Sequence, residues 1–258
     1  MHPLMDVTTD GMLGGRLRLA QPRDGYRAGV DAALLAAACG AAPGSRLIEA
    51  GCGVGAALLA AAARQPHSNF VGLEIDPFAV ELGRANIVSN EMSDRVRILQ
   101  VNIAAPFSEL NEPAFDGAMA NPPYFDDATA LRGPSPAKTR AWISREGLAA
   151  WIAFLTRAVR EGGDVTLIHR TDRLTDILGH LKSKCGSIQI RPVQPFADSP
   201  AKRVLVRAVK SGKGPLQMLP ALVLHDRAGS KHTEQTERLL RGEAALDWMP
   251  QPHRRAKV

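Results

Sequence analysis

The tetrapeptide Asn121-Pro122-Pro123-Tyr124 brings together groups that could hold a planar amino group. The Asn121 amide oxygen accepts hydrogen bonds, and the Pro122 carbonyl has no ladder partner because Pro123 lacks an N–H. Together these two oxygens could accept both hydrogens of an –NH2 group. Tyr124, with Phe125 behind it, offers a flat ring on which a nucleobase can stack. The alternative interpretation is a rigid turn that happens to carry an aromatic residue.

A second motif places glycine at every second position, at Gly51, Gly53 and Gly55. This spacing lets the backbone turn tightly and leaves no Cβ in the way of a ligand. It differs from the G-x-G-x-x-G fingerprint that seats a pyrophosphate at a helix N-terminus. Glu49, two positions before the first glycine, suits a ligand that carries an ammonium group rather than phosphates. A plain glycine-rich turn between a strand and a helix remains the alternative.

A third motif ends an apolar run in acid about twenty residues after the glycine turn. The carboxylate of Glu74 could accept both hydroxyls of a ribose. Asp76 followed by Pro77 is a strong helix start, with the aspartate as N-cap and the proline in the first helical position. The two acids can divide these tasks, Glu74 binding a ribose and Asp76 capping the helix.

Short apolar runs alternate with helical patterns along most of the chain. We expect strands over residues 47–50, 70–75, 96–101, 115–120 and 164–169, and helices over 55–64, 77–89, 148–160 and 173–184. Residues 187–191 and 203–209 alternate apolar with polar and have no helix between them, so they should pair antiparallel. The pattern predicts an α/β fold with a doubly wound, mostly parallel seven-stranded sheet that ends in an antiparallel β-hairpin. This inventory is typical of class I methyltransferases.

The flanking segments indicate three parts. Residues 1–44 should form an N-terminal extension, with a helix over 30–39 and a small hairpin from 17–19 and 26–27, that packs on the cofactor site. The methyltransferase domain should cover residues 45–210. Residues 211–258 begin with a linker-like stretch and should form a C-terminal extension with a basic tail.

Composition excludes several classes of protein. The chain of 258 residues is 45% hydrophobic and 22% charged, as expected for a globular protein rather than a disordered one. No apolar run approaches the ~20 residues of a membrane-spanning helix. Three cysteines without a C-x-x-C pair argue against a disulfide framework or a metal site. The cytoplasm is the expected location, and the net charge of +6 is weakly in favour of RNA as a partner.

Taken together, the motifs at Glu49–Gly55, Glu74 and Asn121–Tyr124 resemble those of class I S-adenosylmethionine-dependent methyltransferases. The Asn-Pro-Pro-Tyr form is found in amino methyltransferases, which act on exocyclic adenine or guanine amines or on a glutamine amide. Residues 25–35 and 201–206 are similar to the bacterial tRNA(Val) (adenine-N6) methyltransferase family, which methylates the adenosine just after the anticodon. The likeness runs from about residue 7 to residue 240.

The resemblance implies S-adenosylmethionine as the cofactor and assigns roles to named residues. Asn121, Pro122 and Tyr124 would be catalytic. The cofactor would be bound by Glu49, Gly51, Gly53, Gly55, Glu74 and Asn102, the last beside the adenine ring, where many relatives have aspartate. Asp31 would touch the methionine end of the cofactor, although an acid at a helix N-terminus is an equally good explanation. Apart from the resemblance, cationic residues after the catalytic turn and in the late hairpin could hold phosphates of the substrate, with Phe125 nearby: Arg132, Lys138, Arg140, Arg145, Lys202 and Arg203. The alternative is that these are ordinary surface charges that keep the protein soluble.

The implied substrate is an adenine in RNA, most simply in tRNA. Three alternatives stay open: methylation of a glutamine N5 in a protein, methylation of a small molecule, and a non-catalytic module that binds cofactor and RNA. The glutamine methyltransferases usually carry a separate helical N-terminal domain, for which only about 45 residues are present here. The sequence leaves open whether the protein is a monomer or a homodimer.

Overall fold

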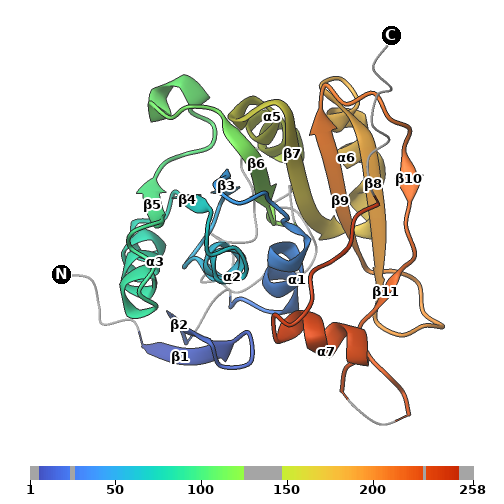
Figure 1. Cartoon of the computed structure of the whole chain (residues 1–258), viewed down its shortest axis with the longest axis horizontal. Coiled ribbons are helices and arrows are strands. Elements are labelled where there is room, and N and C mark those ends of the chain that lie inside the picture. Colours follow the sequence, from blue (N-terminus) through green and yellow to red (C-terminus); the bar gives the residue numbers. More distant parts are fainter. Residues whose placement is uncertain (1–5, 24–26, 125–146, 229–230, 250–258) are drawn as a thin grey trace, which may run out of the picture.

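The computed structural model describes residues 6–23, 27–124, 147–228 and 231–249. Its centre is a nine-stranded sheet in the order β10-β8-β9-β7-β6-β3-β4-β5, with β11 also paired to β8 (Figure 1). The strands are β3 (Arg46–Ala50), β4 (Asn69–Glu74), β5 (Val96–Gln100), β6 (Phe115–Ala120), β7 (Val159–Arg170), β8 (Cys185–Gln194), β9 (Arg203–Lys210), β10 (Gln217–Met218) and β11 (Leu222–Val223).

The predicted fold class is confirmed. Strands β3 to β7 pair in parallel, and β9 lies antiparallel between β7 and β8. The predicted number of seven strands is too low, because β10 and β11 add two-residue segments parallel to β8. Segments this short show no periodicity in the sequence, which is why the count missed them.

Helices cover both faces of the sheet. Helices α1 (Val30–Ala38), α2 (Ala56–Arg64) and α3 (Pro77–Ser89) lie on one face, whereas α5 (Gly147–Ala158) and α6 (Leu174–Leu181) lie on the other (Figure 1). Two short 3-10 helices occupy Phe107–Leu110 and Thr171–Arg173. Within β3, Leu47 packs in the core on the first face and Ile48 in the core on the second. This alternation, repeated on neighbouring strands, buries the parallel sheet on both sides.

The N-terminal hairpin differs from the prediction. Strand β2 (Leu17–Pro22) pairs with β1 (Val7–Met12), which precedes it, whereas residue 26 of the predicted partner segment lies outside the described residues. The turn runs through residues 13–16, where Gly14 and Gly15 have φ values of 67° and 88°. Two glycines in the left-handed region make this turn more favourable than the Pro-Arg-Asp-Gly segment that the prediction used.

Two asparagines of α3 hold the hairpin. Asn86 accepts from the Ala20 N–H at 2.8 Å and donates to the Ala20 carbonyl at 2.9 Å, and Asn90 forms the same pair of bonds with Arg18. Asn86 and Asn90 are four residues apart in the helix, a rise of about 6 Å, and their partners Ala20 and Arg18 are two residues apart in the strand, about 6.6 Å. The spacing of the two side-chain amides therefore matches the spacing of the backbone groups that they bind. Asn86 also donates to the Val54 carbonyl at 3.0 Å, which ties the hairpin to the glycine turn.

The C-terminal segment packs back onto α1. Helix α7 (Glu234–Leu240) begins after Thr233, whose side chain accepts from the Thr236 N–H, and the Trp248 indole donates to the Ala38 carbonyl at 2.7 Å. None of the helices in the described ranges has the length and apolar character needed to cross a membrane.

Candidate active site

The glycine turn joins β3 to α2 at the edge of the sheet where the parallel strands end. Gly51, Gly53 and Gly55 have φ values of 64°, 54° and 88°, a region that side chains other than glycine rarely adopt. A Cβ on Gly51 would come within 2.3 Å of the Trp151 ring of α5, whereas a Cβ on Gly53 would meet nothing within 4 Å. The turn is therefore packed from below at Gly51 and open above at Gly53, as a ligand cradle requires.

Glu49 is buried beneath this turn and is only 3% exposed. Burial raises the pKa of its carboxyl to about 8; a hydrogen bond from the Leu58 backbone N–H opposes this shift, and the Glu74 carboxylate adds to it. Its Oε2 atom has no hydrogen-bond partner within the described ranges. A buried carboxylate with a free oxygen needs a cation nearby, so Glu49 fits the ammonium of S-adenosylmethionine.

This shift predicts that cofactor binding tightens as the pH rises towards about 8. Below that value Glu49 is mostly protonated in the free protein, and an ammonium partner favours its ionised form, so binding must release a proton. The affinity should rise by up to about tenfold per pH unit below pH 8 and fall again where the cofactor's own ammonium loses its proton. Calorimetric titration with the cofactor from about pH 6 to pH 9 measures this, with Glu49→Gln as the control. Identical pH profiles for both proteins would contradict the prediction.

Glu74 ends β4 and closes the other side of the turn. Its Oε2 accepts from the Gly53 N–H at 2.8 Å, and its Oε1 accepts from the backbone N–H groups of Ile75 and Asp76 at 2.8 and 3.0 Å. A carboxylate offers about four acceptor positions, so Oε2 keeps one for a ribose hydroxyl. Asp76 caps α3 by accepting from the Phe78 N–H at 2.9 Å, which confirms its predicted role, whereas ribose binding by Glu74 stays a prediction.

Asn102 lies just after β5 and is exposed. Its Oδ1 accepts from the Ala104 N–H at 2.9 Å and so forms a local turn. The oxygen that the resemblance offers to the cofactor's adenine therefore already has a partner. Contact between Asn102 and the adenine stays a prediction.

The register of the sheet brings Asn121 to the glycine turn. Ala50 of β3 and Ala120 of β6 are direct partners, so Gly51 and Asn121 are the first residues beyond two hydrogen-bonded strands. Neighbouring strands lie about 4.8 Å apart. The Asn121 Oδ1 atom and the Pro122 side chain are shielded from solvent at this place.

Tyr124 joins Asp31 and Arg203 in one cluster. The tyrosine hydroxyl donates to Asp31 Oδ2, while Arg203 Nε donates to Asp31 Oδ2 at 3.0 Å and to the tyrosine oxygen at 3.1 Å. The Arg203 guanidinium lies over the Tyr124 ring, 4.7 Å from its centroid. Burial raises the pKa of Tyr124 above its usual range, and Asp31 adds to the shift, so the hydroxyl stays a proton donor.

The cluster changes how its members are interpreted. The sequence assigned Asp31 to the cofactor and Arg203 to the substrate, but the structure shows them paired with each other around the tyrosine hydroxyl. This arrangement fixes the orientation of the Tyr124 ring. Contacts of Asp31 with cofactor and of Arg203 with substrate stay predictions.

Removing only the hydroxyl tests the cluster. Tyr124→Phe keeps the ring but loses the hydrogen bond to Asp31, so we expect methyl transfer to slow about tenfold. Tyr124→Ala also loses base stacking, which contributes about 1–3 kcal/mol per base, and should slow transfer by about a further tenfold or more. Steady-state kinetics of both variants make the comparison. Equal losses would contradict the stacking role of the ring, and an unchanged rate in Tyr124→Phe would contradict the role of the hydroxyl bond.

Among the remaining predicted substrate residues, the structure describes only Lys202. Lys202 is exposed beside Arg203 at the start of β9, on the same edge of the sheet as Asn121. Phe125, Arg132, Lys138, Arg140 and Arg145 lie outside the described residues.

Sequence reasoning missed two aromatic side chains of the site. Trp151 packs beneath Gly51, and the buried His169 ring meets Tyr124 edge-on with centroids 5.3 Å apart. His169 comes at the carboxyl end of a predicted strand, so its place on the ligand edge of the sheet was readable from the sequence. Trp151 carried no signal, because an aromatic residue on an amphipathic helix is normally part of the core.

Comparisons with known proteins agree with this geometry. The family model "Methyltransferase small domain" matches residues 27–132. A tRNA1(Val) (adenine(37)-N6)-methyltransferase of Porphyromonas gingivalis is 29% identical over 207 residues, covering 77% of this chain and 80% of its own length.

Two further proteins are similar to the chain. An rRNA N(6)-adenosine-methyltransferase of Caenorhabditis elegans is 30% identical over 143 residues; the match covers 55% of this chain and only 60% of that relative. The crystal structure of a predicted O-methyltransferase from Agrobacterium tumefaciens superimposes with a TM-score of 0.71 at 25% identity, over 84% of this chain and 98% of the other. The comparisons therefore agree with the glycine and Asn-Pro-Pro-Tyr motifs: the chain is similar to class I S-adenosylmethionine-dependent methyltransferases and has their fold.

Proposed function

We propose that this enzyme methylates the exocyclic N6 amine of an adenine in tRNA. The observation that carries the proposal is the register of β3 and β6, which aligns Gly51 with Asn121 at one edge of the sheet. Cofactor held over the glycine turn would then lie next to the oxygens that receive the amine. Two relatives that are named as acting on N6 of adenine, one in tRNA and one in rRNA, support the same chemistry.

Bound S-adenosylmethionine supplies an electrophilic methyl group, so the task of the protein is to present the nucleophile in line with the sulfur. An adenine amine is a poor nucleophile because its lone pair is delocalised into the ring. The Asn121 amide oxygen and the Pro122 carbonyl accept both amine hydrogens, which favours a tetrahedral nitrogen and stabilises the positive charge that develops there. Correct placement contributes up to about 7–11 kcal/mol in such reactions.

Tyr124 explains how an adenine of a folded RNA could be held in the active site. The target adenine must leave its stack to enter the site, and this unstacking is unfavourable. Stacking on the Tyr124 ring would replace the lost contact. Asp31 and Arg203 hold that ring in place through its hydroxyl.

The proposal extends to the organisation and location of the protein. Residues 1–44 and 211–258 would be extensions of a methyltransferase domain at 45–210. The enzyme would act in the cytoplasm, as a monomer or a homodimer.

Labelled methyl transfer tests the proposal. The protein is incubated with labelled S-adenosylmethionine and one of three acceptors: a tRNA(Val) transcript, the same transcript with guanine in place of the adenine after the anticodon, or a peptide release factor. We expect label only in the first, recovered as N6-methyladenosine after digestion. Label in the release factor would support the glutamine alternative instead, and equal label in both transcripts would refute the position.

A further inference from the structure

A basic cavity lies far from Asn121, at the edge of the sheet where the parallel strands begin. It has a volume of about 590 Å³ and is formed by the ends of α5 and α6 together with the loops that flank β8 and β9. Five cationic side chains and one carboxylate line it: Arg157, Lys182, Lys184, Lys210, Lys213 and Glu161.

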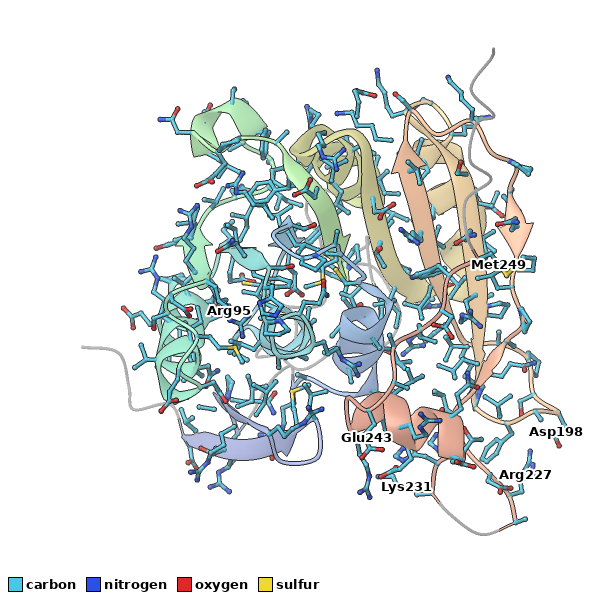
Figure 2. All side chains as sticks on the ribbon, viewed as in Figure 1. Arg95, Asp198, Arg227, Lys231, Glu243 and Met249 are labelled. Atoms are coloured by element: carbon cyan, nitrogen blue, oxygen red, sulfur yellow. The ribbon has the colours of Figure 1, made fainter. Side chains whose placement is uncertain are left out.

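The cations of this cavity are largely unneutralised. Lys210 donates to the Val159 carbonyl at 2.8 Å and lies 3.7 Å from Glu161, a carboxylate that is itself 70% exposed. Lys182, Lys184 and Lys213 are exposed and form no ion pair in the part of the chain that the structure describes. Cations elsewhere on the surface differ: exposed Arg227, in the segment after β11, is paired with Asp198 at 3.0 Å, and Figure 2 shows the two side by side.

Helix ends explain only part of this arrangement. Lysines near the C-terminus of α6 complement its dipole, which accounts for Lys182 and Lys184. Lys210 and Lys213 come from the end of β9 and the loop after it, and Ser211 between them has a φ of 57°. Positive charges repel one another. The gathering of lysines from separate segments around one cavity therefore indicates a polyanionic ligand.

The position of the cavity fits a long substrate. Arg203 and Lys210 are the two ends of the eight-residue strand β9, the first in the Tyr124 cluster and the second in the cavity. Seven residue steps along a strand span about 23 Å. A single nucleotide cannot reach both places, but a folded RNA is long enough to contact both.

We propose that this cavity binds backbone phosphates of the RNA substrate, at a distance from the methylated nucleotide. The inference rests on the proposed function, because it takes RNA as the substrate. Lysine contacts to phosphate are independent of sequence and add affinity through the release of counterions. They would favour a complete tRNA over a short RNA that carries the same target.

The salt dependence of tRNA binding tests this site. The full-length protein is titrated with tRNA(Val) transcript at several KCl concentrations, as wild type, as Lys184→Gln/Lys213→Gln, and as a charge-matched control, Arg18→Gln/Arg97→Gln. The control residues are exposed on β2 and on β5, the strand at the other edge of the sheet. We expect the slope of log Kd against log salt to fall by about 2 in the lysine variant only.

A second measurement separates the possible outcomes. Methylation of a short oligonucleotide that carries the target loop should be equal in the wild type and the lysine variant, while methylation of tRNA at low concentration should be slower in the variant. An unchanged slope, or equal changes in both variants, would overturn the inference. The lysine variant could keep the wild-type salt dependence of tRNA binding, while pyrophosphate raises the thermal stability of the wild type but not of the variant. This result would also overturn the inference, and it would indicate a small phosphorylated ligand instead. Absence of methylation with every RNA would refute the proposed function. The salt dependence of tRNA binding would still show whether the cavity binds RNA phosphates.

Discussion

Asn121→Ala should reduce the rate of methyl transfer by about 100- to 1000-fold while cofactor affinity changes by less than about twofold. The alanine keeps the turn between Ala120 and Pro122 but removes the oxygen that accepts one amine hydrogen. That interaction strengthens as the nitrogen becomes tetrahedral and gains charge, so its loss affects kcat rather than binding. Rapid-quench measurement of transfer, together with calorimetric titration of S-adenosylmethionine, separates the two effects.

Asn102→Ala is the control for this measurement. Asn102→Ala removes an exposed asparagine from the end of another strand of the same sheet, so it reports general disturbance of that edge. We expect it to retain most of the transfer rate at saturating cofactor, because the predicted contact of Asn102 with the adenine ring would affect cofactor affinity instead. If Asn121→Ala lost cofactor affinity and rate together, Asn121 would be a structural part of the cofactor site and amine methylation would need another acceptor group.

Local signals explain which parts of the fold were predictable. Helix α3 was predicted with both its ends, because Asp76 and Pro77 mark the start and the apolar pattern runs out at Ser89. The hairpin of residues 7–22 was not, because two glycine-containing turns compete within fifteen residues and the choice depends on docking to Asn86 and Asn90. Those contacts cross about 70 residues of sequence and leave no trace in the pattern of either segment.

The active site shows the same division. Parallel strands end at one edge, so the meeting of the glycine turn with Asn121 followed from the order of elements alone. The pairing of Asp31 with Tyr124 and Arg203 did not, since these residues are 93 and 172 positions apart from Asp31. From the sequence, each of these residues was interpreted as a separate ligand contact. A charged residue near a site can equally well hold a neighbouring side chain in place, and the sequence does not distinguish the two roles.

Coupling between the hairpin and the cofactor turn follows from one side chain. Asn86 is 1% exposed and donates to both the Ala20 and the Val54 carbonyls. A buried amide that loses a partner is costly, by about 1–3 kcal/mol. The hairpin therefore stabilises the glycine turn, although it contributes no side chain to the glycine motif itself.

Gly51→Ala should destabilise the protein by about 2–4 kcal/mol, because the new Cβ would lie 2.3 Å from the Trp151 ring in a backbone with φ of 64°. Gly53→Ala is the matched control: its φ is 54° but its Cβ meets nothing within 4 Å, so we expect a loss of only about 1 kcal/mol. Urea denaturation of both variants measures the difference.

The partner of Gly51 identifies the cause of that difference. Trp151→Phe shortens the ring that the new Cβ would strike, so in the Gly51→Ala background it should recover part of the lost stability, a coupling that a double-mutant cycle detects. Gly53→Ala should instead weaken cofactor binding at nearly unchanged stability, since its Cβ projects into the open side of the turn. Equal destabilisation by the two alanines, with no coupling to Trp151, would mean that backbone strain alone explains the glycines, and the packing of α5 beneath the cofactor turn would have no part in shaping it.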